Sequence, residues 1–161
     1  MIRIVKIGLI SSVVLWGFFG ALGNVLNWEE TRGAVAAVTS MVTFDGGAES
    51  WQATSNQVVI WLGALFIMLS KLSAGVLCIV GAGRMWQSRN GSVADFSAAK
   101  GIALAGCGIA VIMLFGGFIV IAESWFELWR SEAMGAVLSA ALRYGSMIAV
   151  IAILVATPDD L

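Results

Sequence analysis

The sequence predicts an all-α membrane protein: a four-transmembrane-helix bundle with a short amphipathic helix on its outer surface. Of the 161 residues, 60% are hydrophobic and only 12% are charged, whereas a soluble domain carries about 25% charged residues. The apolar residues also gather in four long stretches, each close to the ~20 residues that a spanning helix needs. We therefore expect a single transmembrane domain over residues 1–161.

The first apolar stretch, residues 7–26, follows two basic residues, Arg3 and Lys6. Basic residues before an apolar run are also typical of a signal peptide, whose apolar core is about 7–15 residues long. Because this stretch is longer, we interpret it as a retained first span. Asn24 and Asn27 close the span on its outer side, and we expect these interfacial amides to bond across helices.

A short amphipathic helix is expected over residues 31–42, between the first and second spans. Apolar residues recur there at helical spacing, namely Ala34, Val35, Val38, Met41 and Val42. A helix with one apolar face is typical of a segment lying on the outer leaflet. An ordinary loop helix packed on the neighbouring spans has the same pattern, so both interpretations stay open.

Three further spans are expected at residues 58–83, 101–122 and 135–156. A capping box, in which Ser92 and Asp95 satisfy each other's backbone N–H groups, predicts a helix start shortly before the third span. Small residues recur four apart along the spans, a spacing that lets helices approach closely in lipid. This spacing serves packing within one bundle and contact between subunits equally well.

The basic residues predict that both termini and the 84–100 loop lie in the cytoplasm. Five lysines and arginines fall in the N-terminal tail and in this loop. The other two loops carry only Arg32 and Arg130, among several acidic residues. Because positive residues are concentrated in cytoplasmic loops, these two loops should lie outside, with Arg130 at the membrane surface.

Three charges interrupt or border the spans: Lys71 in the second, Arg143 in the fourth and Glu123 at the end of the third. A lysine or arginine at the bilayer centre costs about 2.5–3.5 kcal/mol, so each should face the bundle interior or a partner. Arg143 and Glu123 lie on consecutive antiparallel helices and are expected to pair, with Glu127 as a second acceptor. Lys71 has no acid at its depth, which leaves a neutral amine, a hydrogen bond to a nearby serine or carbonyl, or an acid on another chain.

Composition excludes several functional classes. The chain has no histidine, which removes imidazole haem ligation, most catalytic zinc sites and histidine acid–base chemistry. Its two cysteines, Cys78 and Cys107, fall inside apolar stretches, where a free thiol behaves as a small hydrophobe. A net charge of −1 provides no basic surface for nucleic acid. We therefore expect no cofactor, no metal site and no catalytic residues.

Several local strings follow the pattern of one known family. They are Ser40-Met41-Val42-Thr43-Phe44, Val76-Leu77-Cys78 followed by Gly81-Ala82, Phe96 with Ala99-Lys100-Gly101, Trp125-Phe126 with Trp129 and Ser131, and Ala141-Leu142-Arg143. On these strings the chain resembles an uncharacterised bacterial family of predicted small four-span integral membrane proteins, a domain of unknown function. The resemblance implies the four-span fold and a bacterial cytoplasmic (inner) membrane, and it implies no activity.

The chain departs from that family pattern at two charged positions. The resemblance implies a glutamate where this chain has Lys71, and another before the Trp-Phe pair, where this chain has Ser124 with Glu123 just ahead of it. Reversing a charge inside the membrane changes what the site can pair with. The departure argues against a proton- or cation-handling role that depends on the glutamate.

The function predicted is that of a non-catalytic accessory or structural subunit docked to a larger membrane protein complex. The packing motifs of the spans and the missing partner of Lys71 both favour it. One alternative is a small oligomeric transporter or channel that draws an anionic solute to Lys71 and Arg143. Another is a protein that binds a lipid or quinone, with Arg32, Arg130 or Arg143 meeting a headgroup. The expected partners are the bilayer, other membrane subunits in a hetero- or homo-oligomer, and a bound lipid, but no nucleic acid.

Overall fold

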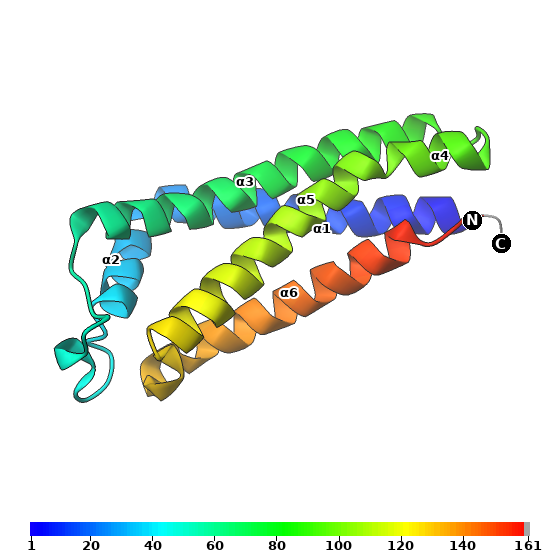
Figure 1. Cartoon of the computed structure of the whole chain (residues 1–161). Helices are drawn as coiled ribbons and strands as arrows, with labels where there is room; N and C mark the ends of the chain where they lie inside the picture. The colour runs from blue at the N-terminus through cyan, green and yellow to red at the C-terminus, as the bar shows by residue number, and fades with distance from the viewer. Residues whose placement is uncertain (160–161) are drawn as a thin grey trace.

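The computed structural model describes residues 1–159 and confirms the all-helical, four-span fold (Figure 1). Four helical segments are long and apolar enough to cross a membrane: Ile2–Leu26, Gln57–Gln87, Val93–Trp125 and Glu132–Ala156. Between residues 1 and 159 there is no β-strand. We call the end that holds Met1, helix α4 (Val93–Ala99) and Asp159 the terminal end, and the end that holds helix α2 (Trp28–Thr39) the loop end.

Helices α1 (Ile2–Leu26) and α3 (Gln57–Gln87) form a tight antiparallel pair. Gly17 makes this contact possible, because a Cβ atom added there would lie 2.7 Å from the backbone oxygen of Lys71 and 2.9 Å from Cα of Gly75. In lipid, small contact residues allow such a close backbone approach. The backbone of α3 at Lys71 therefore rests directly on α1.

The third span is built from three consecutive helical segments, α4 (Val93–Ala99), α5 (Gly101–Val111) and the π-helical η2 (Ile112–Trp125). The expected capping box begins it: Ser92 Oγ accepts from the N–H of Asp95 at 3.1 Å, and Asp95 Oδ2 accepts from the N–H of Ser92 at 3.2 Å. Two short 3₁₀ turns, η3 (Leu128–Arg130) and η4 (Glu132–Met134), then lead into α6 (Gly135–Ala156).

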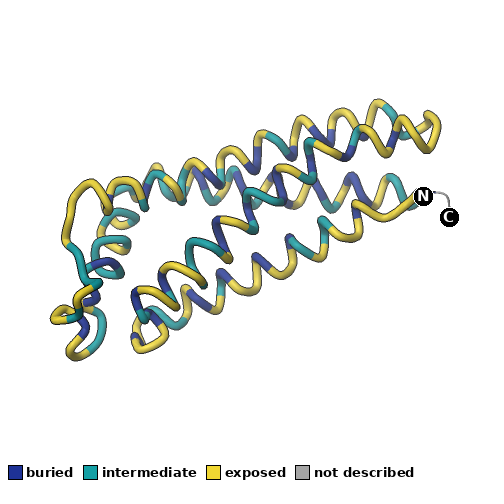
Figure 2. Tube along the Cα trace, in the orientation of Figure 1, coloured by how far each residue is buried: buried dark blue, intermediate teal, exposed yellow. Residues whose placement is uncertain are grey.

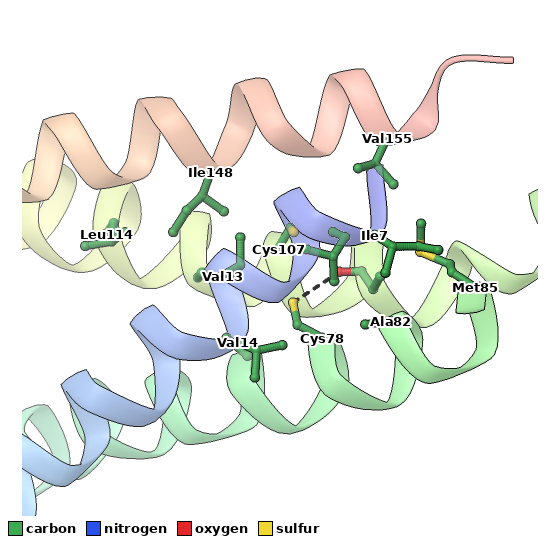
Figure 3. Packing of buried hydrophobic residues seen from close by; sticks show 14 of the residues in the cluster. Ile7, Val13, Val14, Cys78, Ala82, Met85, Cys107, Leu114, Ile148 and Val155 are labelled. Carbon is green, nitrogen blue, oxygen red and sulfur yellow. Dashed lines mark hydrogen bonds between the residues drawn. The ribbon is translucent and has the colours of Figure 1, made fainter. Parts of the chain in front are cut away.

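The hydrophobic core fills the terminal half of the bundle. Cys78 and Cys107 lie fully buried at its centre, and the Cys78 thiol donates to the carbonyl oxygen of Ala103 at 3.6 Å (Figure 3). Side chains from α1, α3, α5 and α6 converge around them, including Ile7, Val13, Met85, Ile148 and Val155. The outward sides of the same helices are exposed (Figure 2), as expected where helices face acyl chains.

The short helix α2 runs from Trp28 to Thr39, not over residues 31–42 as the periodicity predicted. It begins earlier because Asn27 alone separates it from α1, with a non-helical backbone at φ −113° and ψ 48°. It ends earlier because Met41 adopts a left-handed φ of 55°. Trp28 stacks against Trp61 of α3, with ring centroids 5.5 Å apart, and this contact fixes α2 on the loop end of α3. A further short turn, η1 (Gly47–Glu49), follows in the connection to α3.

Candidate functional site

A large, partly open cavity lies in the loop half of the bundle, where η2 diverges from α3 (Figure 1) and α2 lines one side. Its volume is about 860 Å³, inside the range of about 300–1,000 Å³ that is usual for small-molecule pockets. Apolar side chains of α2, α3, η2 and α6 make most of its wall, whereas α1 contributes glycines and Asn24. The polar lining residues are Asn24, Asn27, Glu30, Thr31, Thr39 and Lys71.

Four glycines form part of the cavity wall. Gly20, Gly23, Gly63 and Gly117 all line it and contribute no side chain to fill it. At Gly23 an added Cβ atom would meet nothing within 4 Å, whereas at Gly20 it would lie 2.9 Å from Cδ of Lys71. Gly23 therefore borders empty space, and Gly20 provides the groove in which the lysine side chain lies.

Lys71 reaches along α1 toward the loop end. Side chains of a helix lean toward its N-terminus, and α3 begins at the loop end. The half-buried ammonium group donates a hydrogen bond to Oδ1 of Asn24 at 2.8 Å. The lysine thus has a hydrogen-bond partner within the chain, although neither the serines nor the carbonyls considered from the sequence provide it. Helix rise gives the depth of a Cα atom only, whereas this side chain carries its charge about a helical turn closer to the surface.

Asn24 also joins α1 to α2. Its Nδ2 group donates to Oγ1 of Thr31 at 3.0 Å, and that hydroxyl donates to the backbone oxygen of Asn27 at 3.1 Å. Asn24 therefore bonds across helices, as its position predicted. The side chain of Asn27 instead donates to the carbonyl oxygen of Gly23, in its own helix, at 3.1 Å. Lys71, Asn24, Thr31 and Asn27 thus belong to one connected set of polar groups in the cavity wall, and Glu30 and Thr39 line it separately.

Arg143 and Glu123 do not form the expected ion pair. Arg143 is exposed on α6 and Glu123 is half-buried on η2, and no ion pair among residues 1–159 involves either of them. The cause is rotational position: Ala141 and Gly145 face the bundle, and Arg143, two residues from each, points about 200° away from them. Gly145 also packs against Leu114 of η2, so Arg143 lies deeper in the bundle than Glu123 as well as facing away from it.

Arg130 connects the segment after η2 with the α2–α3 connection at the loop end. Its guanidinium group pairs with the carboxylate of Glu127 at 2.8 Å and lies 4.5 Å from the ring centroid of Phe44. It also donates to the backbone oxygen of Asp45 at 3.3 Å. Glu127, considered as a second acceptor for Arg143, is therefore engaged by Arg130 instead.

A buried ionic cluster closes the terminal end, and it is not among the contacts expected from the sequence. The ammonium group of Lys6 is fully buried and donates to Oδ1 of Asp159 at 2.7 Å and to the backbone oxygen of Thr157 at 2.7 Å. Lys100 pairs with the same carboxylate and donates to the same backbone oxygen at 2.8 Å. The cluster therefore fixes the segment after α6 against α1 and the start of α5.

The electrostatics of this cluster favour an ionised Asp159. Burial would raise the pKa of the Asp159 carboxyl, but the hydrogen bonds and charges of Lys100 and Lys6 outweigh that effect and hold the pKa below its ordinary value. The carbonyls at the C-terminal end of α6 supply further negative potential to the two lysines. The sequence signal for this cluster is weak: in the sequence, Lys6 and Lys100 indicate only the orientation of the spans, and Asp159 lies beyond the end of the fourth span.

The four apolar spans define a multi-pass integral membrane protein. A family described as "Predicted small integral membrane protein (DUF2165)" matches residues 2–158, and the chain belongs to that family. The match confirms the resemblance to a family of small integral membrane proteins with no assigned activity. No curated protein and no solved structure matches the chain significantly.

Proposed function

We propose that this protein binds a lipid-like small molecule in the loop-half cavity and catalyses no reaction. The cavity carries the proposal: a volume of about 860 Å³, walls that are mostly apolar, and a small number of polar groups. This combination is typical of ligand sites, where apolar surface provides affinity and a few polar groups fix orientation. The missing partner of Lys71 was a reason to expect another subunit, and the hydrogen bond to Asn24 weakens that reason.

The placement of the cavity favours binding over conduction. Its walls belong to the loop half, from Gly20 and Lys71 outward, whereas the terminal half is filled by the hydrophobic core. A solute pathway needs access from both sides of the membrane, which this one-sided hollow does not supply. Its polar groups also lack a nucleophile held beside a base, the arrangement that covalent catalysis requires.

The experiment compares ligand retention in two glycine variants of the same helix. Gly23→Leu should fill part of the cavity, because an added Cβ atom there meets open space. Gly8→Leu is the matched control, since Gly8 also lies on α1 with nothing within 4 Å but does not line the cavity. After purification in mild detergent and organic extraction, mass spectrometry should find an apolar molecule bound to the wild type and to Gly8→Leu, and depleted in Gly23→Leu. Equal amounts in all three proteins, or no bound molecule, would contradict the proposal.

A role as an accessory subunit is the second candidate, and exposed Arg143 supports it. An arginine on the lipid-facing side of a span is costly unless it reaches the headgroups or pairs with an acid on another chain. Ser139 and Ser146 lie on the same side of α6 by their helical spacing and are also exposed. A membrane protein that co-purifies with the wild type and is released by Arg143→Leu would support docking through this face.

We propose a bacterial inner membrane as the location, with the terminal end in the cytoplasm. Five basic residues lie at this end, in the first six residues and between residues 84 and 100, and positive residues favour the cytoplasmic side. Cysteine-accessibility labelling of intact cells tests this orientation. An impermeant reagent should label a cysteine introduced at Glu49 but not one introduced at Asn90, and the reverse pattern would overturn it.

A further inference from the structure

We infer that the cavity takes an anionic amphiphile, a carboxylate with one apolar chain, whose head binds the ammonium group of Lys71. The inference rests on the proposed function and specifies its ligand. Three observations lead to it: the unused donors of Lys71, the single cation among the lining residues, and the position of the one lining carboxylate.

Lys71 has donors to spare inside the cavity. An ammonium group carries three N–H donors, and Asn24 accepts one of them at 2.8 Å. No carboxylate among residues 1–159 lies within 4.0 Å of this ammonium group. A cation among apolar spans is costly without a countercharge, and a ligand carboxylate would provide both the charge and two acceptor oxygens.

The lining favours a carboxylate over a phosphate. Lys71 is the only lysine or arginine among the lining residues, and the other donors there are neutral amides and hydroxyls. Planar arginine forks, which suit phosphate oxygens bidentately, are missing from this lining. A volume of about 860 Å³ also matches one ligand of ordinary small-molecule size, which favours a single apolar chain over a two-chain phospholipid.

The charges of the cavity set the direction of the ligand. Glu30, in the first turn of α2, is the one carboxylate among the lining residues; it is exposed and does not pair with the ammonium group of Lys71, so the one cation of the lining is left for the ligand. The Lys71–Asn24 pair is therefore the electrostatically favoured place for the head. Phe66, Ile67 and Phe118 provide apolar walls in the same cavity, against which the chain of the ligand would pack.

The test is a binding series with ligands of matched length on the full chain in nanodiscs of neutral lipid. Palmitic acid, the corresponding sixteen-carbon alcohol and the corresponding amine are titrated against the wild type. The expected order is the carboxylate first, at least tenfold tighter than the alcohol, a difference of ~1.4 kcal/mol, with the amine weakest. Phosphatidic acid is added as a competitor of bound palmitate. It should displace the bound palmitate less well than an equal amount of added palmitate does.

Two variants assign the preference to Lys71. Lys71→Met keeps the length of the side chain and removes the charge, so the carboxylate should bind no more tightly than the alcohol. Asn24→Asp is nearly isosteric and places an internal carboxylate at the position that now accepts from Lys71 at 2.8 Å, so it should abolish the preference while the lysine remains. Arg143→Met is the control, because it removes an exposed cation outside the cavity and should leave the preference unchanged.

The outcomes separate this inference from the proposed function. Palmitate and the alcohol binding equally well, with both affinities reduced by Gly23→Leu, would overturn the anionic ligand and leave the cavity as a binding site. A tenfold preference that survives both Lys71→Met and Asn24→Asp would also overturn it, as would phosphatidic acid binding more tightly than palmitate. Binding of none of the three ligands, together with no effect of Gly23→Leu on co-purified molecules, would refute the proposed function itself.

Discussion

Asp159→Asn should destabilise the folded protein by leaving two lysines at the terminal end without their carboxylate. The side chains of Lys6 and Asp159 are both 0% exposed, and that of Lys100 is 3% exposed. Removing one partner of a buried ion pair costs about 3–5 kcal/mol, because the remaining charge stays buried without compensation. Lys6 and Lys100 both keep a hydrogen bond to the carbonyl oxygen of Thr157, so we expect the lower end, a loss of about 3 kcal/mol.

The measurement is the free energy of unfolding in mixed micelles, from tryptophan fluorescence as the denaturing detergent is increased. Asp45→Asn is the matched control: Asp45 is exposed at the loop end, and only its backbone oxygen accepts a bond, from Arg130. A triple replacement of Lys6, Lys100 and Asp159 by apolar residues should recover most of the loss, because a buried ionic cluster is often no more stable than an apolar one. If Asp159→Asn changed the free energy of unfolding by less than about 0.5 kcal/mol, as a surface substitution does, the structural role assigned to the cluster would be wrong.

Two further predictions concern the pH dependence of the ionic cluster and the close contact between α1 and α3. The pKa of Asp159 is lowered in the folded state, so the contribution of its carboxylate to stability is present above about pH 4 and is lost as the pH falls through the folded-state pKa. In that acidic range the wild type should therefore lose more free energy of unfolding than Asp159→Asn. Equal losses in the two proteins would disprove this pH linkage. Gly17→Ala should cost about 1–3 kcal/mol, because its Cβ atom would lie 2.7 Å from the backbone oxygen of Lys71, whereas Gly8→Ala should cost nothing measurable in the same assay.

The spans could be predicted from sequence because lipid imposes a length and a composition on every crossing helix. The same reasoning supplied the capping box at Ser92, which depends only on local backbone geometry. The bounds of α2 were harder to predict. Met41, shortly after the end of α2, has a left-handed backbone conformation, and a methionine gives no sequence signal for that conformation.

The side-chain partners could not be predicted in the same way. Depth along a helix follows from counting residues, but the direction a side chain faces depends on how the helices are rotated and crossed. That is why Arg143 and Glu123 lie on neighbouring spans and fail to meet, and why the bond between Lys71 and Asn24 could not be predicted. The cavity itself results from the divergence of η2 from α3, a property of the packed bundle that no single segment of sequence contains.

The two halves of the bundle are packed to different degrees, and this difference separates folding from recognition. Buried contacts concentrate near Cys78 and Cys107 in the terminal half, so substitutions there should be selected mainly for their effect on stability. Residues around Gly23 and Phe66 border open space and can change size or polarity at little cost to the fold. Members of the family could therefore diverge in what they bind while keeping the same scaffold, with variation in each helix increasing toward the loop end.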